Sequence, residues 1–207
     1  MSYCATKEEG RETLKMIKHL EKGQFGYLSA KKKRNLIIMI IAFAFVIACF
    51  IIGLVIFKNK NNILTVASVV LVLPAAKFAV AYFILLPHAS AQLHLKEAVE
   101  RISGNLIVLY DLVLSNKVSP IGTQVVAITD TLIIALTNET KADKKLFENS
   151  VKEFMQVDGC SVTVKLYTDE KSFLAKLNML AKSNSDDATK DLTKVKKNSA
   201  SIQSMAI

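Results

Sequence analysis

The sequence is poor in the residues from which metal centres and redox sites are built. Its three cysteines share no spacing typical of metal ligands and predict no disulfide framework. Its three histidines are scattered, and no two of them lie four residues apart, as ligands on one helix face would. The sequence therefore gives no support for a zinc site, and we expect no cofactor.

Motifs of several enzyme classes are also missing. The sequence has no Gly-rich phosphate loop, no nucleophile elbow, no paired-histidine metal motif and no set of kinase motifs. Basic residues are abundant and the net charge is +9, but no aromatic or Arg-rich stripe accompanies them. Nucleic acid is therefore not an expected partner.

Charge is absent from Leu36–Phe57, the first of two long apolar runs. As a helix with a rise of ~1.5 Å per residue, this run spans roughly 33 Å, enough for a hydrocarbon core of about 30 Å. The second run, Ile63–Leu86, is interrupted only by Pro74 and Lys77. Backbone groups inside a bilayer must be satisfied within the segment, so both runs are expected to be helices. The short connection between them predicts an antiparallel hairpin.

Basic residues flank one side of the first run. Four of them directly precede it: Lys31, Lys32, Lys33 and Arg34. An excess of Lys and Arg marks the cytoplasmic side, and the hairpin over 36–86 returns the chain to that side at Pro87. We therefore expect a multi-pass membrane protein with two spans and both termini in the cytoplasm. The same basic residues are expected to contact the anionic head groups of the lipid bilayer.

Residues 1–35 form a basic N-terminal segment with a thin apolar stripe at helical spacing, which predicts an amphipathic helix. The stripe consists of Leu14, Ile17 and Leu20. It is too narrow to distinguish docking on the folded domain from lying on the membrane surface or fraying in water.

Lys77 is an ionisable residue inside a predicted span, and such residues are functional candidates. Its position in the second run lets its stem reach toward the cytoplasmic boundary, and neither run offers an acidic partner. We therefore expect Lys77 to extend toward the head groups, with a transport role as the alternative.

From Pro87 the pattern changes to that of a cytoplasmic α/β domain over 87–183. A helix is expected around Leu95–Ile102 and ends at Ser103-Gly104. Three runs rich in Val, Ile, Leu and Thr then predict strands: Leu106–Ser115, Gln124–Asp130 and Thr131–Asn138. Near-continuous apolarity in the last of them predicts burial on both faces of the sheet.

The second half of the domain repeats the alternation of helix and strand. We expect a helix over 140–157, a strand over Ser161–Tyr167 and a helix capped by Thr168-Asp169. The order αβββαβα predicts a mixed four-stranded sheet, with a crossover between parallel strands. Residues 184–207 have little apolar content and are expected to form a polar tail, weakly helical or disordered.

This element order resembles the core of the restriction-endonuclease-like superfamily, and within it the nuclease-related domain, over roughly residues 91–182. Such domains follow an Asp-bearing strand with Glu-x-Lys at the end of the next strand. The resemblance implies that the carboxylates hold a divalent metal and that the lysine positions water. Glu139-Thr140-Lys141 matches the Glu-x-Lys, whereas Val126 stands where the Asp is expected.

The nearest other acids are Asp111, which strand alternation would turn toward solvent, and Asp130, which we interpret as a turn residue. Glu139 and Lys141 are better explained as polar residues that lead into the next helix. We therefore predict a membrane-anchored binding or scaffolding module on a degenerate nuclease-like fold. The alternatives are a membrane-tethered nuclease acting through Glu139 and Lys141, and a small transporter or membrane-complex subunit. Besides the lipid bilayer, the candidate partners are a protein complex and further copies of this chain.

Overall fold

A computed structural model describes residues 20–57, 63–116, 118–140, 142–186 and 192–207. The chain divides into two compact units. One, here called the hairpin unit, is Ser29–Pro87, and the other, the folded unit, joins the chain up to Leu28 with His88–Ile207. The sequence predicted a domain over 87–183, so the folded unit recruits more of the chain at both ends than expected.

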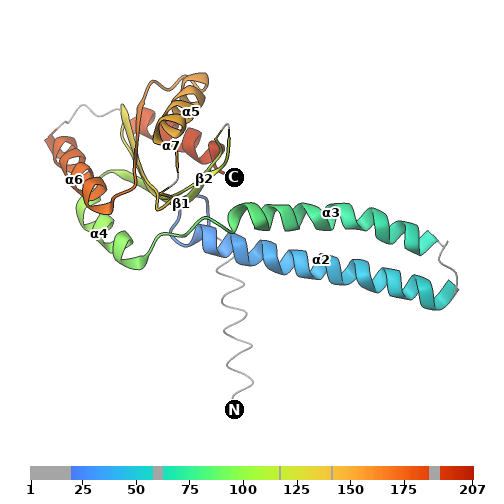
Figure 1. Cartoon of the computed structure of the whole chain (residues 1–207). Coiled ribbons are helices and arrows are strands. Elements are labelled where there is room, and N and C mark those ends of the chain that lie inside the picture. The colour runs from blue at the N-terminus through green and yellow to red at the C-terminus, as the bar shows by residue number, and fades with distance from the viewer. Residues whose placement is uncertain (1–19, 58–62, 117, 141, 187–191) are drawn as a thin grey trace, which may run out of the picture. The chain divides into compact units, whose positions relative to one another are not determined.

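Two long helices make up the hairpin: α2 (Tyr27–Phe57) and α3 (Ile63–Leu85) lie side by side and run in opposite directions (Figure 1). The helices predicted from the apolar runs are therefore confirmed. Both are long and apolar enough to cross a membrane. Helix α2 begins before its apolar run, so the basic residues at 31–34 lie in its first turns. The connecting residues 58–62 lie outside the described part of the chain.

One four-stranded sheet forms the centre of the folded unit. Its strands, in spatial order, are β1 (Ile107–Leu114), β2 (Ile121–Ile128), β3 (Leu132–Leu136) and β4 (Thr163–Tyr167). The first two pairings are antiparallel, and β3 pairs with β4 in parallel. The predicted mixed sheet is confirmed. Strand β2 starts earlier than the predicted Gln124, because Gly122 and Thr123 already pair with β1.

Within the described residues, four helices accompany the sheet: α4 (Leu93–Ser103), α5 (Lys144–Val157), α6 (Glu170–Asp186) and α7 (Leu192–Met205). Two begin at aspartate caps. Asp143 accepts a hydrogen bond from the N–H of Leu146, and Asp169 accepts one from Ser172 at 2.9 Å. The hydroxyl and N–H of Ser172 hold the pKa of Asp169 below its usual range. The cap that the sequence predicted at Asp169 is therefore confirmed.

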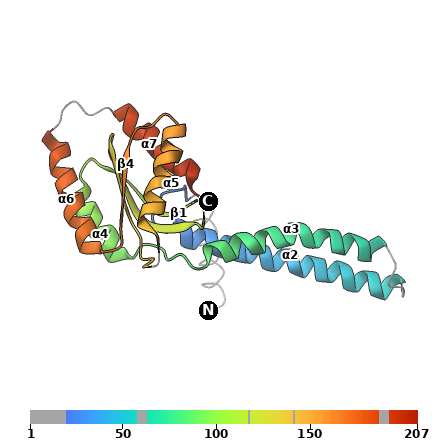
Figure 2. The ribbon, with the colours of Figure 1, turned by 45° about the horizontal axis from the view of Figure 1, so that its top comes forward.

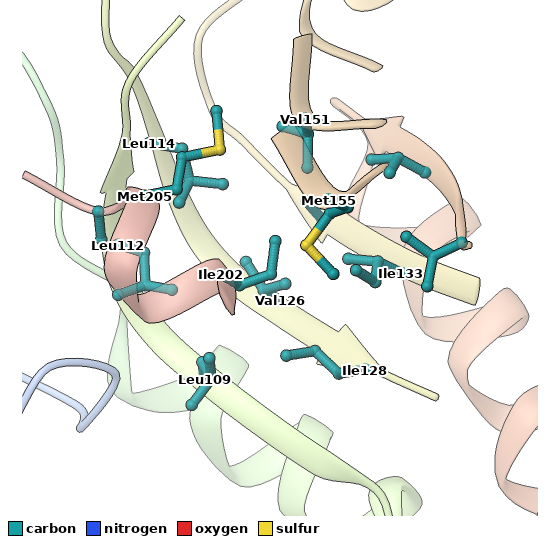
Figure 3. Packing of buried hydrophobic residues seen from close by; sticks show 14 of the residues in the cluster. Leu109, Leu112, Leu114, Val126, Ile128, Ile133, Val151, Met155, Ile202 and Met205 are labelled. Carbon is teal, nitrogen blue, oxygen red and sulfur yellow. The ribbon is translucent and has the colours of Figure 1, made fainter. Parts of the chain in front are cut away.

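Helices α4 and α6 cover one face of the sheet, and α5 and α7 cover the other (Figure 2). Neighbouring residues of β3 pack on opposite faces of the sheet: Ile133 lies on the α5 and α7 side, and Ile134 lies on the α4 and α6 side. Figure 3 shows Met155 of α5 and Ile202 of α7 over Val126 of β2. The predicted burial of β3 on both faces is thus confirmed, and it requires a helical layer on each side.

Helix α7 contradicts the prediction of a weakly helical or disordered tail. Its buried side chains recur at helical spacing as Val195, Asn198, Ile202 and Met205. The amide of Asn198 donates to the carbonyls of Thr129 and Asp130 at 3.0 and 3.1 Å. The prediction failed because it counted apolar residues, and a helix with few of them still packs when all lie on one face. Residues 187–191 lie outside the described part of the chain.

Both edge strands of the sheet make hydrogen bonds to segments outside the sheet. On β1, the N–H of Tyr110 donates to the carbonyl of Gly23 at 2.8 Å, and the N–H of Ile207 donates to the carbonyl of Val113 at 2.9 Å. On β4, the carboxylate of Glu148 accepts from the N–H of Leu166 at 3.0 Å. Unpaired strand edges invite pairing with other chains, so these contacts protect the folded unit from edge-to-edge association.

Candidate functional site

Asp111 is the most unusual residue of the sheet. Its side chain is 1% exposed, and its backbone is left-handed with φ of 55°. Leu109 and Leu112, on either side of it, pack into the same core although regular alternation would separate them. The expectation that Asp111 faces solvent is therefore wrong. Aspartate tolerates the left-handed conformation better than most residues, and this local reversal turns its carboxylate inward.

The carboxylate of Asp111 binds both chain segments that flank the hairpin. Its Oδ2 accepts from the N–H of Gly26 at 2.7 Å, and its Oδ1 accepts from the N–H of Ala91 at 2.6 Å. Gly26 directly precedes α2, and Ala91 lies a few residues after α3. Hydrogen bonds to a charged acceptor contribute about 1.5–3 kcal/mol each. We call Gly26, Asp111 and Ala91 the Asp111 clasp.

Contacts around Phe25 and Tyr110 reinforce the incoming segment. The two rings meet edge to face with centroids 6.1 Å apart, and the ammonium of Lys96 lies 5.1 Å from the Phe25 centroid. Burial, with a smaller contribution from Glu100, raises the pKa of Tyr110 to about 12. Tyr110 therefore stays neutral under all physiological conditions, and its ring acts as a packing surface.

A second set of contacts joins the same segment to the last helix. The ammonium of Lys22 donates to the carbonyl of Ala206 at 2.7 Å, and the amide of Gln203 donates to the carbonyl of Lys22 at 3.0 Å. Residues far apart in sequence thus fix the chain just before it enters α2. Periodicity reports only neighbours along the chain, so these contacts could not be predicted from it.

Glu139, the acidic residue of the predicted Glu-x-Lys, contacts the chain segment that follows the hairpin. Its Oε1 accepts from the N–H of Gly122 at 2.8 Å and lies 2.6 Å from Nδ1 of His88, the first residue after Pro87. A Cβ at position 122 would stand 2.8 Å from the His88 side chain and 2.9 Å from Oε1, so glycine is required there. The imidazole of His88 is 4% exposed, which denies it to a bulky substrate.

The other candidate acids do not join Glu139. Asp130 lies in the turn between β2 and β3, as predicted, whereas Gly122 and Glu139 meet at the opposite end of β2. At about 3.4 Å per residue along a strand, the two ends are roughly 25 Å apart. Val126 is fully buried in the core, and Lys141 lies outside the described residues. Within the described part of the chain, no three His, Cys, Asp or Glu residues gather as metal ligands would.

The basic residues before the hairpin lie in the first turns of α2. The ammonium of Lys32 donates to the carbonyl of Leu86 at 3.2 Å, which joins the start of α2 to the residue after α3. Lys33 and Arg34 are exposed, whereas Lys31 and Lys32 are partly buried. Lys77 is exposed on α3, in the turn after Pro74.

A polar cavity of about 210 Å³ lies where the parallel strands β3 and β4 end. It is lined by Gln92, His94, Leu95, Gln124, Leu136, Thr137, Asn138, Thr168 and Glu170. The sequence analysis did not identify this site. Its one local signal was Gln124, a carboxamide at the head of an otherwise apolar run in a strand.

Comparison of the chain with protein-family models, curated proteins and solved structures found no match. The resemblance to the nuclease-related domain therefore stays a prediction from the sequence.

Proposed function

We propose that this chain is a membrane-anchored module that binds or scaffolds other molecules at the cytoplasmic face of a membrane. Helices α2 and α3 cross the bilayer, and the folded unit carries the binding function without catalysis. The observation that carries this proposal is the Asp111 clasp, because one buried carboxylate holds the chain on both sides of the hairpin. An anchor attached at both ends suits a module that must stay at the membrane surface.

The exposed side chains of the hairpin support membrane insertion. Val55 of α2 and Leu73 of α3 are 69% and 73% exposed, and many other large apolar residues of these helices are exposed too. In water, apolar surface of this kind is unfavourable by about 25 cal/mol per Å². Soluble monomers rarely present such continuous apolar faces, whereas a bilayer is their natural solvent.

The charge distribution supports the orientation. Lys31–Arg34 precede the membrane part of α2, and Leu86 lies at the same end of the hairpin. By the preference of Lys and Arg for the cytoplasmic side, both chain ends are cytoplasmic.

The orientation can be tested by labelling cysteines with a membrane-impermeant maleimide in intact cells. The native residues Cys4, Cys49 and Cys160 are first replaced by alanine. A cysteine at Asn61, between the helices, should be labelled, and one at the exposed Ala200 of α7 should be labelled only after lysis. Labelling of Ala200→Cys in intact cells would contradict the proposed orientation.

The use of carboxylates in the folded unit supports a role without catalysis. Asp111 is engaged by two backbone N–H groups, and Glu139 by Gly122 and His88. A divalent cation needs several oxygen ligands, and one carboxylate holds it poorly against water. We therefore expect weak binding of Mn²⁺ and no cleavage of DNA or RNA.

Calorimetry with Mn²⁺ and a nuclease assay on the full chain in detergent micelles test this expectation. The matched variant is Glu139→Gln combined with Lys141→Ala. Tight Mn²⁺ binding, or nucleic-acid cleavage that this double variant abolishes, would contradict the proposed binding module and indicate a nuclease.

A further inference from the structure

We propose that the polar cavity at the ends of β3 and β4 binds a small, uncharged, planar molecule with adjacent hydrogen-bond donor and acceptor groups, the pattern of a free pyrimidine base. This inference rests on the proposed binding function and names its ligand class.

The location of the cavity is the first argument. Strands β3 and β4 are parallel and end together, with Thr137 donating its N–H to the carbonyl of Tyr167 at 2.9 Å. Helix α6 begins directly after β4, and the first turn of α4 lines the cavity through His94 and Leu95. In sheets with parallel strands, ligands bind in the crevice beyond the carboxyl ends of the strands.

The carboxamides are the second argument. Gln92, Gln124 and Asn138 all line the cavity, and each offers an N–H donor beside a carbonyl acceptor. Gln124 is 9% exposed, and its amide makes a single hydrogen bond within the described residues, a long one of 3.5 Å to the carbonyl of Ser90. Its amide oxygen is thus left to accept from a ligand. Carboxamides pair with base edges through two parallel hydrogen bonds.

Charge and size narrow the ligand further. No Lys or Arg lines the cavity, and its two ionisable residues pair with each other, Nε2 of His94 lying 3.4 Å from Oε2 of Glu170. Phosphate and nucleotides would therefore meet a carboxylate without a compensating cation. Pockets for drug-sized ligands measure about 300–1,000 Å³, so a cavity of about 210 Å³ suits a single ring. The apolar side chains of Leu95 and Leu136 offer a surface for the face of such a ring.

Uracil is the probe, added to the full chain in detergent micelles and followed by saturation-transfer NMR. We expect saturable binding of uracil, and binding of uridine monophosphate at least tenfold weaker because of Glu170. Gln124→Leu should weaken uracil binding about tenfold or more, because it removes one bidentate pair of hydrogen bonds. Gln156→Leu, at an exposed position of α5 outside the cavity, should leave it unchanged.

Asn138 is exposed, so Asn138→Ala provides a second test should Gln124→Leu unfold the chain, and it should weaken uracil binding severalfold. Three results would overturn the inference. They are the absence of saturable uracil binding, uracil binding by both cavity variants that equals that of the unchanged chain, and tighter binding of uridine monophosphate than of uracil. None of these outcomes affects the maleimide labelling or the nuclease assay, so a failure here is distinguishable from a failure of the proposed function.

Discussion

The hairpin and the folded unit place the same types of residue in opposite surroundings. In the folded unit, Ile133, Ile134 and Phe147 are at most 1% exposed, whereas Phe45 and Leu73 of the hairpin are 59% and 73% exposed. Burial in the folded unit comes from the protein itself, because helices cover both faces of the sheet. For the hairpin, the proposed insertion would let the bilayer supply the apolar surroundings. Side-chain chemistry alone therefore does not tell which residues hold this protein together.

The largest effect is expected when one aromatic side chain is truncated in each unit and the resulting changes in unfolding free energy are compared. Phe147→Ala removes a buried ring from the folded unit and should lower its free energy of unfolding by about 3–5 kcal/mol. Phe45→Ala in α2 should leave that free energy unchanged. The readout is the reactivity of Cys160, a buried thiol, during urea unfolding of a Cys4→Ser, Cys49→Ala chain in micelles. Equal effects of the two truncations would mean that the units unfold as one.

The next comparison places a charge at two equally exposed apolar positions. Leu73 of α3 and Met179 of α6 are 73% and 66% exposed. Leu73→Asp should disfavour insertion by about 2.5–3.5 kcal/mol, the value for a carboxylate near the centre of a membrane helix. Met179→Asp should change neither abundance nor stability, because its side chain faces water. Membrane-fraction abundance is the measurement, and a tolerated Leu73→Asp would show that α3 does not span the bilayer.

The Asp111 clasp can be weakened without changing the backbone. Asn tolerates the left-handed conformation at position 111, but its amide nitrogen cannot accept from a second N–H. Asp111→Asn should therefore destabilise the folded unit by about 1.5–3 kcal/mol. Asp130→Asn, at a surface turn, is the matched control and should stay within about 0.5 kcal/mol. The measurement is urea unfolding followed by the reactivity of Cys160. Equal stability of the two variants would show that the Asp111 clasp does not stabilise the folded unit.

The smallest effect concerns high pH and the packing of Tyr110. The pKa of Tyr110 is about 12 in the folded unit, against an ordinary value of 10.0. The unfolded chain therefore loses this proton at a lower pH than the folded unit does. Below pH 10 both states are neutral and no stability is lost, whereas between pH 10 and 12 the unfolded state is increasingly favoured. Tyr110→Phe should match the parent at pH 7 and lose less stability over that window. Parallel losses in both proteins would place the alkaline sensitivity elsewhere.

Prediction from the sequence succeeded for several patterns that are local. The apolar runs, the alternation in β4 and the cap at Asp169 all depend on residues within a few positions of each other. The limits of a buried stripe are harder to predict, since Leu146 and Phe154 of α5 are only partly buried. They flank the buried stripe of Phe147, Val151 and Met155, and helical spacing alone does not fix where such a stripe ends.

The sequence by itself determined the two long apolar helices and the mixed sheet. Only the tertiary structure decided that Asp111 turns inward, that α7 completes one layer and that Gln124 meets His94 across a cavity. The reason is physical. Helix and strand periods record which side of an element is apolar, whereas the partner of a buried polar group is chosen by contacts between segments far apart in the chain.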